Sequence, residues 1–266
     1  MLRSVFTKVL HDQWRVVLAW AFFSGLWPAL YIALYPSIGA VEEMQKLLDS
    51  MPPAIRQLFS SSELDIGTPE GYLNIEMFSF VAPLLVMAYT VVVASGATAG
   101  EEDKGTLDLL LANPVRRWRV LAEKSLAFAL GTAVIGLGMW LGLAGGAAVA
   151  GVGLNLGLVG QAIVSALLLG LAFGSFAMAI GALTGQRWLS AGLALAVAVA
   201  SFFLNGLGSL VDWLDLWRPV SPFYHYIAGD PLVHGLDPGH VLVLVAGTLI
   251  GFAVAVVAFE RRDLRR

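Results

Sequence analysis

The chain has 266 residues, of which 58% are apolar and 13% are charged, and its formal net charge is −3 at pH 7. A typical soluble domain has about 25% charged residues, so this chain lacks the polar surface needed to cover a globule in water. The acidic balance disfavours a nucleic-acid partner, because phosphate binding requires a basic surface. Cysteine is absent, which excludes disulfides, thiolate metal sites and cysteine nucleophiles.

Long uncharged stretches predict an all-α polytopic membrane protein forming one domain, residues 1–266. A helix needs roughly 20 apolar residues to cross about 30 Å of hydrocarbon. The stretch 125–186 has 62 residues and must therefore fold back, and the glycines and asparagine of 151–157 mark the turn. The six predicted spans are approximately 16–36, 77–100, 121–150, 158–184, 188–211 and 240–259.

Lysine and arginine predict the orientation, because basic residues are retained on the cytoplasmic side during insertion. Thirteen of the 16 basic residues fall at the termini or in the loops after spans two and four, if Lys124 at the start of span three is counted with the loop before it. The other three are Lys46, Arg56 and Arg218. We therefore expect both termini to lie in the cytoplasm and the chain to lie in the inner (plasma) membrane. We read the first span as a retained helix rather than a signal peptide, preceded by a cytoplasmic amphipathic helix.

Proline and glycine inside the spans predict features of the packing. Pro28 and Pro83 should bend the first and second spans, because proline lacks an N–H and clashes with the preceding turn. Gly138, Gly142 and Gly146 recur at every fourth position, a spacing that lets helix backbones approach closely. We take these glycines as support for tight packing.

The two outer segments have different patterns. In the first, residues 36–76, apolar residues at helical spacing predict two short amphipathic helices at the outer membrane surface. They either rest on lipid as a lid or act directly on substrate. In the second, residues 212–240, tryptophan, tyrosine and proline predict interfacial or re-entrant structure that caps the outer mouth.

Histidine and aspartate also occur in the second outer segment. They are His225, Asp230, His234, Asp237 and His240. Their spacing matches no standard zinc pattern. We therefore interpret the histidines as solvated loop residues and predict no metal site.

The inner loop, residues 100–119, carries the most information. Its charges flank a short helix with an apolar face formed by Leu107, Leu110 and Leu111. Asn113 precedes Pro114 as an N-cap precedes a proline at the first helical position, so a second helix can run into the third span. The loop could dock a soluble partner, or it could be an amphipathic connector lying on the inner leaflet.

Residues 101–124 resemble the inner loop of type-2 ABC exporter permeases. The shared pattern has acidic residues before Gly-Thr-Leu-acidic-Leu-Leu-Leu, then a proline, basic residues and a tryptophan. Three further segments are similar to that family: 69–74, 221–224 and 259–264. The resemblance covers essentially the whole chain, because order, spacing and topology agree.

The resemblance implies a permease that works with two copies of a cytosolic ABC ATPase and with a second permease subunit, expected to be an identical chain. The inner loop would be the coupling helix that sits in a groove of the ATPase. The residues that this role implies are Glu101, Glu102, Gly105, Thr106, Leu107, Leu110, Leu111, Pro114, Arg116, Arg117 and Arg119. The chain lacks a phosphate-binding Gly-x-x-x-x-Gly-Lys-Ser/Thr loop, so ATP and Mg²⁺ would bind the partner. We expect no catalytic, cofactor or metal residue in this chain.

Few ionisable residues lie inside the predicted spans, which argues against a proton- or sodium-coupled carrier. The polar groups of the later spans are expected mostly to bond to their own helix backbone. They are Ser165, Ser175, Thr184, Ser190, Ser201 and Asn205. An apolar path favours a hydrophobic or amphiphilic cargo.

The sequence therefore predicts the permease subunit of an ATP-driven exporter. One alternative is a permease that moves no cargo and transmits ATPase motion mechanically to an extracytoplasmic partner. Another is an integral membrane enzyme, which would need a cluster of acid, base or metal-ligand residues near one membrane face. No such cluster is evident in the sequence.

Overall fold

The computed structural model describes residues 5–37, 50, 68–100, 116–208 and 210–261. The elements in these ranges are helices: α1 (Val5–Leu34), α4 (Pro69–Leu73), α5 (Val81–Ala97), α8 (Arg117–Ala150), α9 (Leu156–Thr184), α10 (Arg187–Gly208), α11 (Asp212–Asp215), α12 (Pro222–Ile227) and α13 (Pro238–Arg261), with short helical turns at Tyr35–Ser37, Asn74–Phe78 and Arg218–Val220. Six helical segments, with Pro69–Ala97 taken as one, are long and apolar enough to cross a membrane. The all-α, six-span prediction is confirmed.

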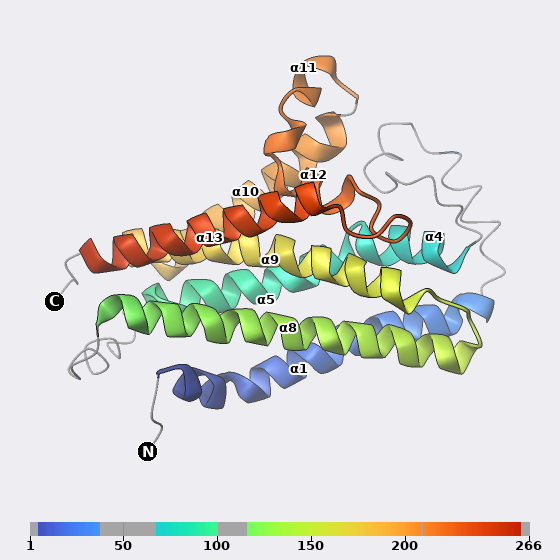
Figure 1. The fold of residues 1–266 in the computed structure, drawn as a ribbon, viewed down its shortest axis with the longest axis horizontal. Coiled ribbons are helices and arrows are strands. Elements are labelled where there is room, and N and C mark those ends of the chain that lie inside the picture. The colour runs from blue at the N-terminus through green and yellow to red at the C-terminus, as the bar shows by residue number, and fades with distance from the viewer. Residues whose placement is uncertain (1–4, 38–49, 51–67, 101–115, 209, 262–266) are drawn as a thin grey trace.

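The long helices run roughly side by side, so their ends gather at two opposite ends of a bundle. The start of α1, the end of α5, the start of α8 and the end of α13 lie at the same end, on the left of Figure 1. The helix predicted before the first span is not separate in the described part of the chain, because α1 runs unbroken from Val5 to Leu34. The two amphipathic helices predicted in the first outer segment lie outside the described residues.

The turn between the third and fourth spans forms where the sequence predicts it. Gly151 ends α8 in a left-handed conformation with φ of 66°, which glycine adopts without strain. Asn155 then caps α9, because its Oδ1 accepts hydrogen bonds from the backbone N–H groups of Gly157 and Leu158 at 3.1 and 3.2 Å.

The glycines spaced by four in α8 face α1 within the same chain. A Cβ on Gly142 would overlap the backbone carbonyl of Gly25, and one on Gly146 would overlap that of Ala29. Gly138 meets Ala21 in the same way. The predicted tight packing is confirmed as a seam between α1 and α8, which we call the glycine seam (α1 with Gly138, Gly142 and Gly146).

The second span is less regular than the sequence predicts. A π-helical turn, Asn74–Phe78, follows α4, and α5 begins only at Val81. Pro83 lies in the first turn of α5, where its missing N–H would have no partner within the helix. The interruption therefore precedes Pro83, whereas α1 continues as an α-helix through the buried Pro28.

Burial differs sharply between the spans. In the most apolar window of α9, 67% of the residues are buried, whereas the value is 28% for α10 and 22% for α13. Two clusters of buried apolar side chains flank α9, one towards α10 and α13 and the other towards α1. Helix α9 is thus the centre of the bundle, and α10 and α13 expose broad apolar faces suited to hydrocarbon.

The second outer segment folds as α11 and α12, which project from the bundle in Figure 1. Hydrogen bonds hold α12 in place: the Tyr226 hydroxyl donates to the carbonyl of Phe78 at 2.6 Å, and the Ser221 hydroxyl donates to that of Ser201 at 2.8 Å. Trp213 and Trp217 are exposed, as expected for side chains at a membrane interface.

Candidate functional site

The candidate site is the inner loop and the helix ends that frame it. Arg116, Arg117 and Arg119 lie among the described residues. The other residues assigned to the site lie outside them, together with the predicted cap at Asn113: Glu101, Glu102, Gly105, Thr106, Leu107, Leu110, Leu111 and Pro114. The structure therefore gives the frame of the loop, formed by the end of α5 and the start of α8.

Helix α8 begins later than the sequence predicts. Arg116 has an extended backbone with ψ of 133°, and the helix starts at Arg117. An extended residue stops helical hydrogen bonding, so a helix starting at Pro114 cannot run unbroken into the third span. Trp118 and Arg119 thus lie in the first turn of α8.

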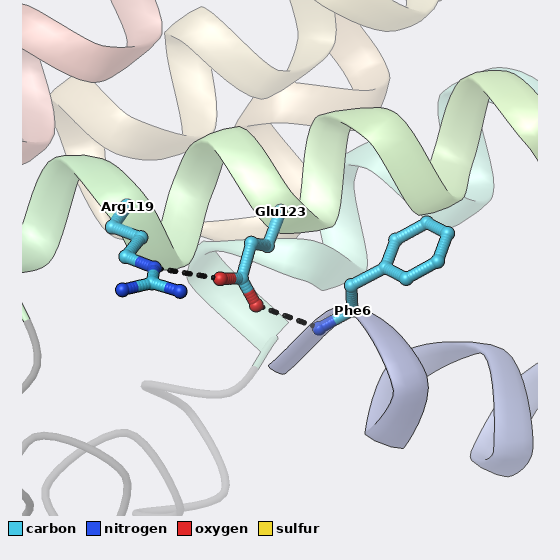
Figure 2. Close-up of polar contacts among 3 residues, drawn as sticks. All are labelled: Phe6, Arg119 and Glu123. Atoms are coloured by element: carbon cyan, nitrogen blue, oxygen red, sulfur yellow. Dashed lines mark hydrogen bonds and ion pairs between the residues drawn. The ribbon is translucent and has the colours of Figure 1, made fainter. Parts of the chain in front are cut away.

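Glu123 connects the start of α8 to the start of α1, as Figure 2 shows. One carboxylate oxygen accepts a hydrogen bond from the Phe6 backbone N–H at 2.9 Å, and the other pairs with Arg119 Nε, also at 2.9 Å. The Phe6 N–H lies in the first described turn of α1, and N–H groups in the first turn of a helix need partners from outside the helix. A carboxylate at this position also faces the positive end of the α1 dipole.

Lys124 connects α8 to α5. Its side chain is buried, with 3% of the residue exposed, and Nζ donates to the carbonyl of Ala97 at 2.7 Å. Ala97 is the last residue of α5, so its carbonyl belongs to the negative end of the helix dipole. A cation fits this position, and it holds α8 against the last residue of α5.

Arg187 brings α10 into the same region. Its side chain lies beside α5 at Gly96 and Gly100, where a Cβ would be 3.8 Å from Nη2 and 3.4 Å from Cδ, respectively. At these distances the arginine side chain packs along the surface of α5 and the residues that follow it. The ends of α1, α5, α8 and α10 therefore touch around the frame of the inner loop.

This frame is suited to transmitting movement. The segment 101–115 joins α5 to α8, so a displacement of that segment acts on both helices. Glu123 and Lys124 are adjacent on α8 and bond to α1 and α5. A push at α8 would therefore reach two neighbouring helices through hydrogen bonds to charged groups, which are stronger than neutral ones.

The polar residues of the later spans follow the prediction only in part. Ser175 and Thr184 donate to Ala172 and Ile180 of their own helix at 2.8 Å, as predicted. Ser165 and Ser190 do not: their hydroxyls donate to other elements, the carbonyls of Tyr226 in α12 and of Ala177 in α9. The prediction was wrong for these two because tertiary contacts offered them other acceptors.

Two histidines of the outer segment lie in contact, which the sequence analysis missed. His225 Nδ1 is 2.9 Å from His240 Nδ1, and His225 Nε2 is 2.8 Å from the carbonyl oxygen of Pro219. Both are partly buried, whereas His234 is exposed. The interpretation as solvated loop residues was therefore wrong for His225 and His240. No group of three potential metal ligands forms among the residues that the structure describes.

Comparison with known families agrees with the resemblance noted above. The family model described as ABC-2 family transporter protein matches residues 6–264. Comparison with curated proteins gave no match. The family match spans all six candidate membrane helices. The chain therefore belongs to the ABC-2 family of transporter membrane proteins.

Proposed function

We propose that this chain is the transmembrane permease subunit of an ATP-driven exporter. It moves a hydrophobic or amphiphilic substrate out of the cytoplasm or inner leaflet by alternating access. The observation that carries the proposal is the family match over residues 6–264. The arrangement of the helix ends supports it, because the ends of α1, α5, α8 and α10 that lie next to the inner loop in sequence or in space contact one another.

The energy comes from a separate cytosolic ABC ATPase in two copies, which binds ATP and Mg²⁺. Its contact on this chain is the inner loop, with Leu107, Leu110 and Leu111 as apolar anchors and the charged residues as a polar rim. The centre of an interface supplies most of the binding energy, and exposed rim charges supply little. Arg117 and Arg119 at the start of α8 belong to this rim.

The second permease subunit is a second copy of this chain. The broad apolar face of α10 supports this, because only 28% of its most apolar window is buried within one chain. A hydrophobic or amphiphilic substrate is supported by the hydroxyls of α9, which are used in hydrogen bonds to backbone carbonyls.

The test is purification of the full chain in mild detergent, followed by reconstitution into liposomes. An ABC ATPase, recognised by its phosphate-binding loop, should co-purify, and ATP should drive movement of fluorescent amphiphiles across the bilayer. Replacing the phosphate-loop lysine of that ATPase should abolish movement without releasing it from the permease.

Two outcomes would contradict the proposal. If no ATPase accompanies the chain, the family role does not hold for this protein. If an ATPase binds and hydrolyses ATP while no amphiphile moves, and an extracytoplasmic partner changes activity with each ATP cycle, the chain transmits force mechanically rather than exporting a cargo.

A further inference from the structure

A surface groove runs between the last turn of α9 and the last turns of α13. Its volume is about 570 Å³, and its described lining is Leu183, Ala253, Val254, Val257, Ala258 and Arg261. Leu183, Val254 and Val257 are exposed along it. Its volume falls within the roughly 300–1,000 Å³ typical of sites for small organic ligands.

The charge in the groove is placed at one end. Among the described lining residues, Arg261 alone is charged, and it is the last residue of α13. An apolar groove that ends in a basic side chain complements a molecule with an apolar chain and an anionic head.

The charged end lies at the level expected for lipid headgroups. The start of α10, the start of α8 and the end of α13 lie at the same end of the bundle in Figure 1. Trp188, in the first turn of α10, is 91% exposed, and Trp118, in the first turn of α8, is 43% exposed. Exposed tryptophans at the ends of spans mark the boundary between hydrocarbon and headgroups.

We propose that this groove binds an anionic phospholipid. Its phosphate pairs with Arg261, and an acyl chain lies along Leu183, Val254 and Val257. A second copy of this chain fits the groove less well, because a two-fold interface there would bring two basic ends together. The proposal does not depend on the ATPase, and in the orientation that the basic residues predict the lipid belongs to the inner leaflet.

The test is native mass spectrometry of the purified full chain with dioleoylphosphatidylglycerol or dioleoylphosphatidylcholine. The anionic lipid should bind several-fold more tightly. Arg261→Gln should weaken its binding about fivefold, the effect of one basic residue near a charged surface, and leave phosphatidylcholine unchanged. Val257→Trp, which fills the groove, should weaken the binding of both lipids.

Two matched controls separate the site from general effects. Lys8→Gln removes a positive charge from an exposed residue near the start of α1, and Leu249→Trp adds the same bulk at an exposed site of α13 outside the groove lining. Neither should change lipid binding. The proposal is wrong if Arg261→Gln binds phosphatidylglycerol as tightly as the parent. It is equally wrong if Lys8→Gln weakens phosphatidylglycerol binding as much as Arg261→Gln does. This comparison of two charge variants tests the proposal even if Val257→Trp does not fold. It is also wrong if Val257→Trp dissociates a dimer without changing lipid binding, since the groove is then a contact between copies.

Discussion

Glu123 caps the N-terminal end of α1. Its carboxylate accepts the Phe6 N–H at 2.9 Å, so Glu123→Ala should leave this N–H without a partner and let the first turn of α1 open. Loss of a comparable cap costs about 1 kcal/mol, which corresponds to roughly fivefold faster exchange of the local amides. Hydrogen–deuterium exchange of peptides covering residues 5–12 measures this.

Arg119→Ala is the matched control, because it removes the pair with Glu123 at 2.9 Å and leaves the bond to Phe6 in place. Exchange in the first turn of α1 should then stay close to that of the parent. Equal exchange in Glu123→Ala and the parent would show that the carboxylate does not hold the helix start.

The contact between His225 and His240 determines which nitrogen carries the proton in each ring. The Pro219 carbonyl only accepts, so His225 Nε2, 2.8 Å away, must be the donor. In the neutral pair, His225 Nδ1 is then the acceptor, and His240 Nδ1 at 2.9 Å must donate to it. We predict the Nε2–H tautomer for His225 and the Nδ1–H tautomer for His240.

Nitrogen-15 NMR of histidine-labelled protein above pH 7.5 distinguishes the two tautomers. The chain has four histidines, and His225→Gln and His240→Gln variants assign the signals. His240 should show a protonated Nδ1. Finding both histidines in the Nε2–H form would contradict the contact.

The sequence indicated which residues are polar but not which groups they meet. Lys124 was read as one more cytoplasmic charge, and the structure buries it against the end of α5. Ser165 and the histidine pair likewise find partners in distant elements. Such pairings depend on how the helices pack, which local residue patterns do not encode.

Among the contacts between helices, the glycine seam can be tested directly by adding a side chain to it. A Cβ on Gly142 would overlap the Gly25 backbone, so Gly142→Ala should push α1 and α8 apart and destabilise the protein by about 1–3 kcal/mol. The measurement is the thermal unfolding midpoint in detergent, which should fall.

Gly145→Ala is the control on the same helix, because nothing lies within 4 Å of a Cβ placed there. Its midpoint should be unchanged or higher, since alanine favours helix over glycine by up to about 1 kcal/mol. If the two variants unfold at the same temperature, the close approach at Gly142 does not hold the helices together.

The sequence predicted the turns and caps whose conformation depends on neighbouring residues. It did not predict those whose conformation depends on contacts between distant helices. The turn at Gly151 and Asn155 was predictable, because glycine permits the left-handed cap and asparagine caps the next helix. The π-helical turn at Asn74–Phe78 was not. Its carbonyl at Phe78 accepts the Tyr226 hydroxyl, a partner 148 residues along the chain that a local pattern does not reveal.

For the whole molecule, the proposed orientation can be tested with single cysteines, because the chain has none of its own. Leu216 and Trp188 are both strongly exposed, in the second outer segment and at the start of α10, respectively. A membrane-impermeant maleimide should label Leu216→Cys in intact cells or spheroplasts and label Trp188→Cys only after the membrane is opened. The reverse pattern would invert the topology.

In the proposed function an ATPase drives this permease through the inner loop, and the most direct measurement compares ATPase retention and ATP-driven transport in loop variants. Leu107→Ala combined with Leu110→Ala should release the ATPase and abolish transport, because truncating an interface anchor costs about 2 kcal/mol or more. Arg117→Ala removes a partly buried charge from the first residue of α8 and should have a smaller effect on both, because a charge at the rim of an interface contributes little. If the double leucine variant retains its ATPase and transports like the parent, the loop is only a connector on the inner leaflet and the account is contradicted.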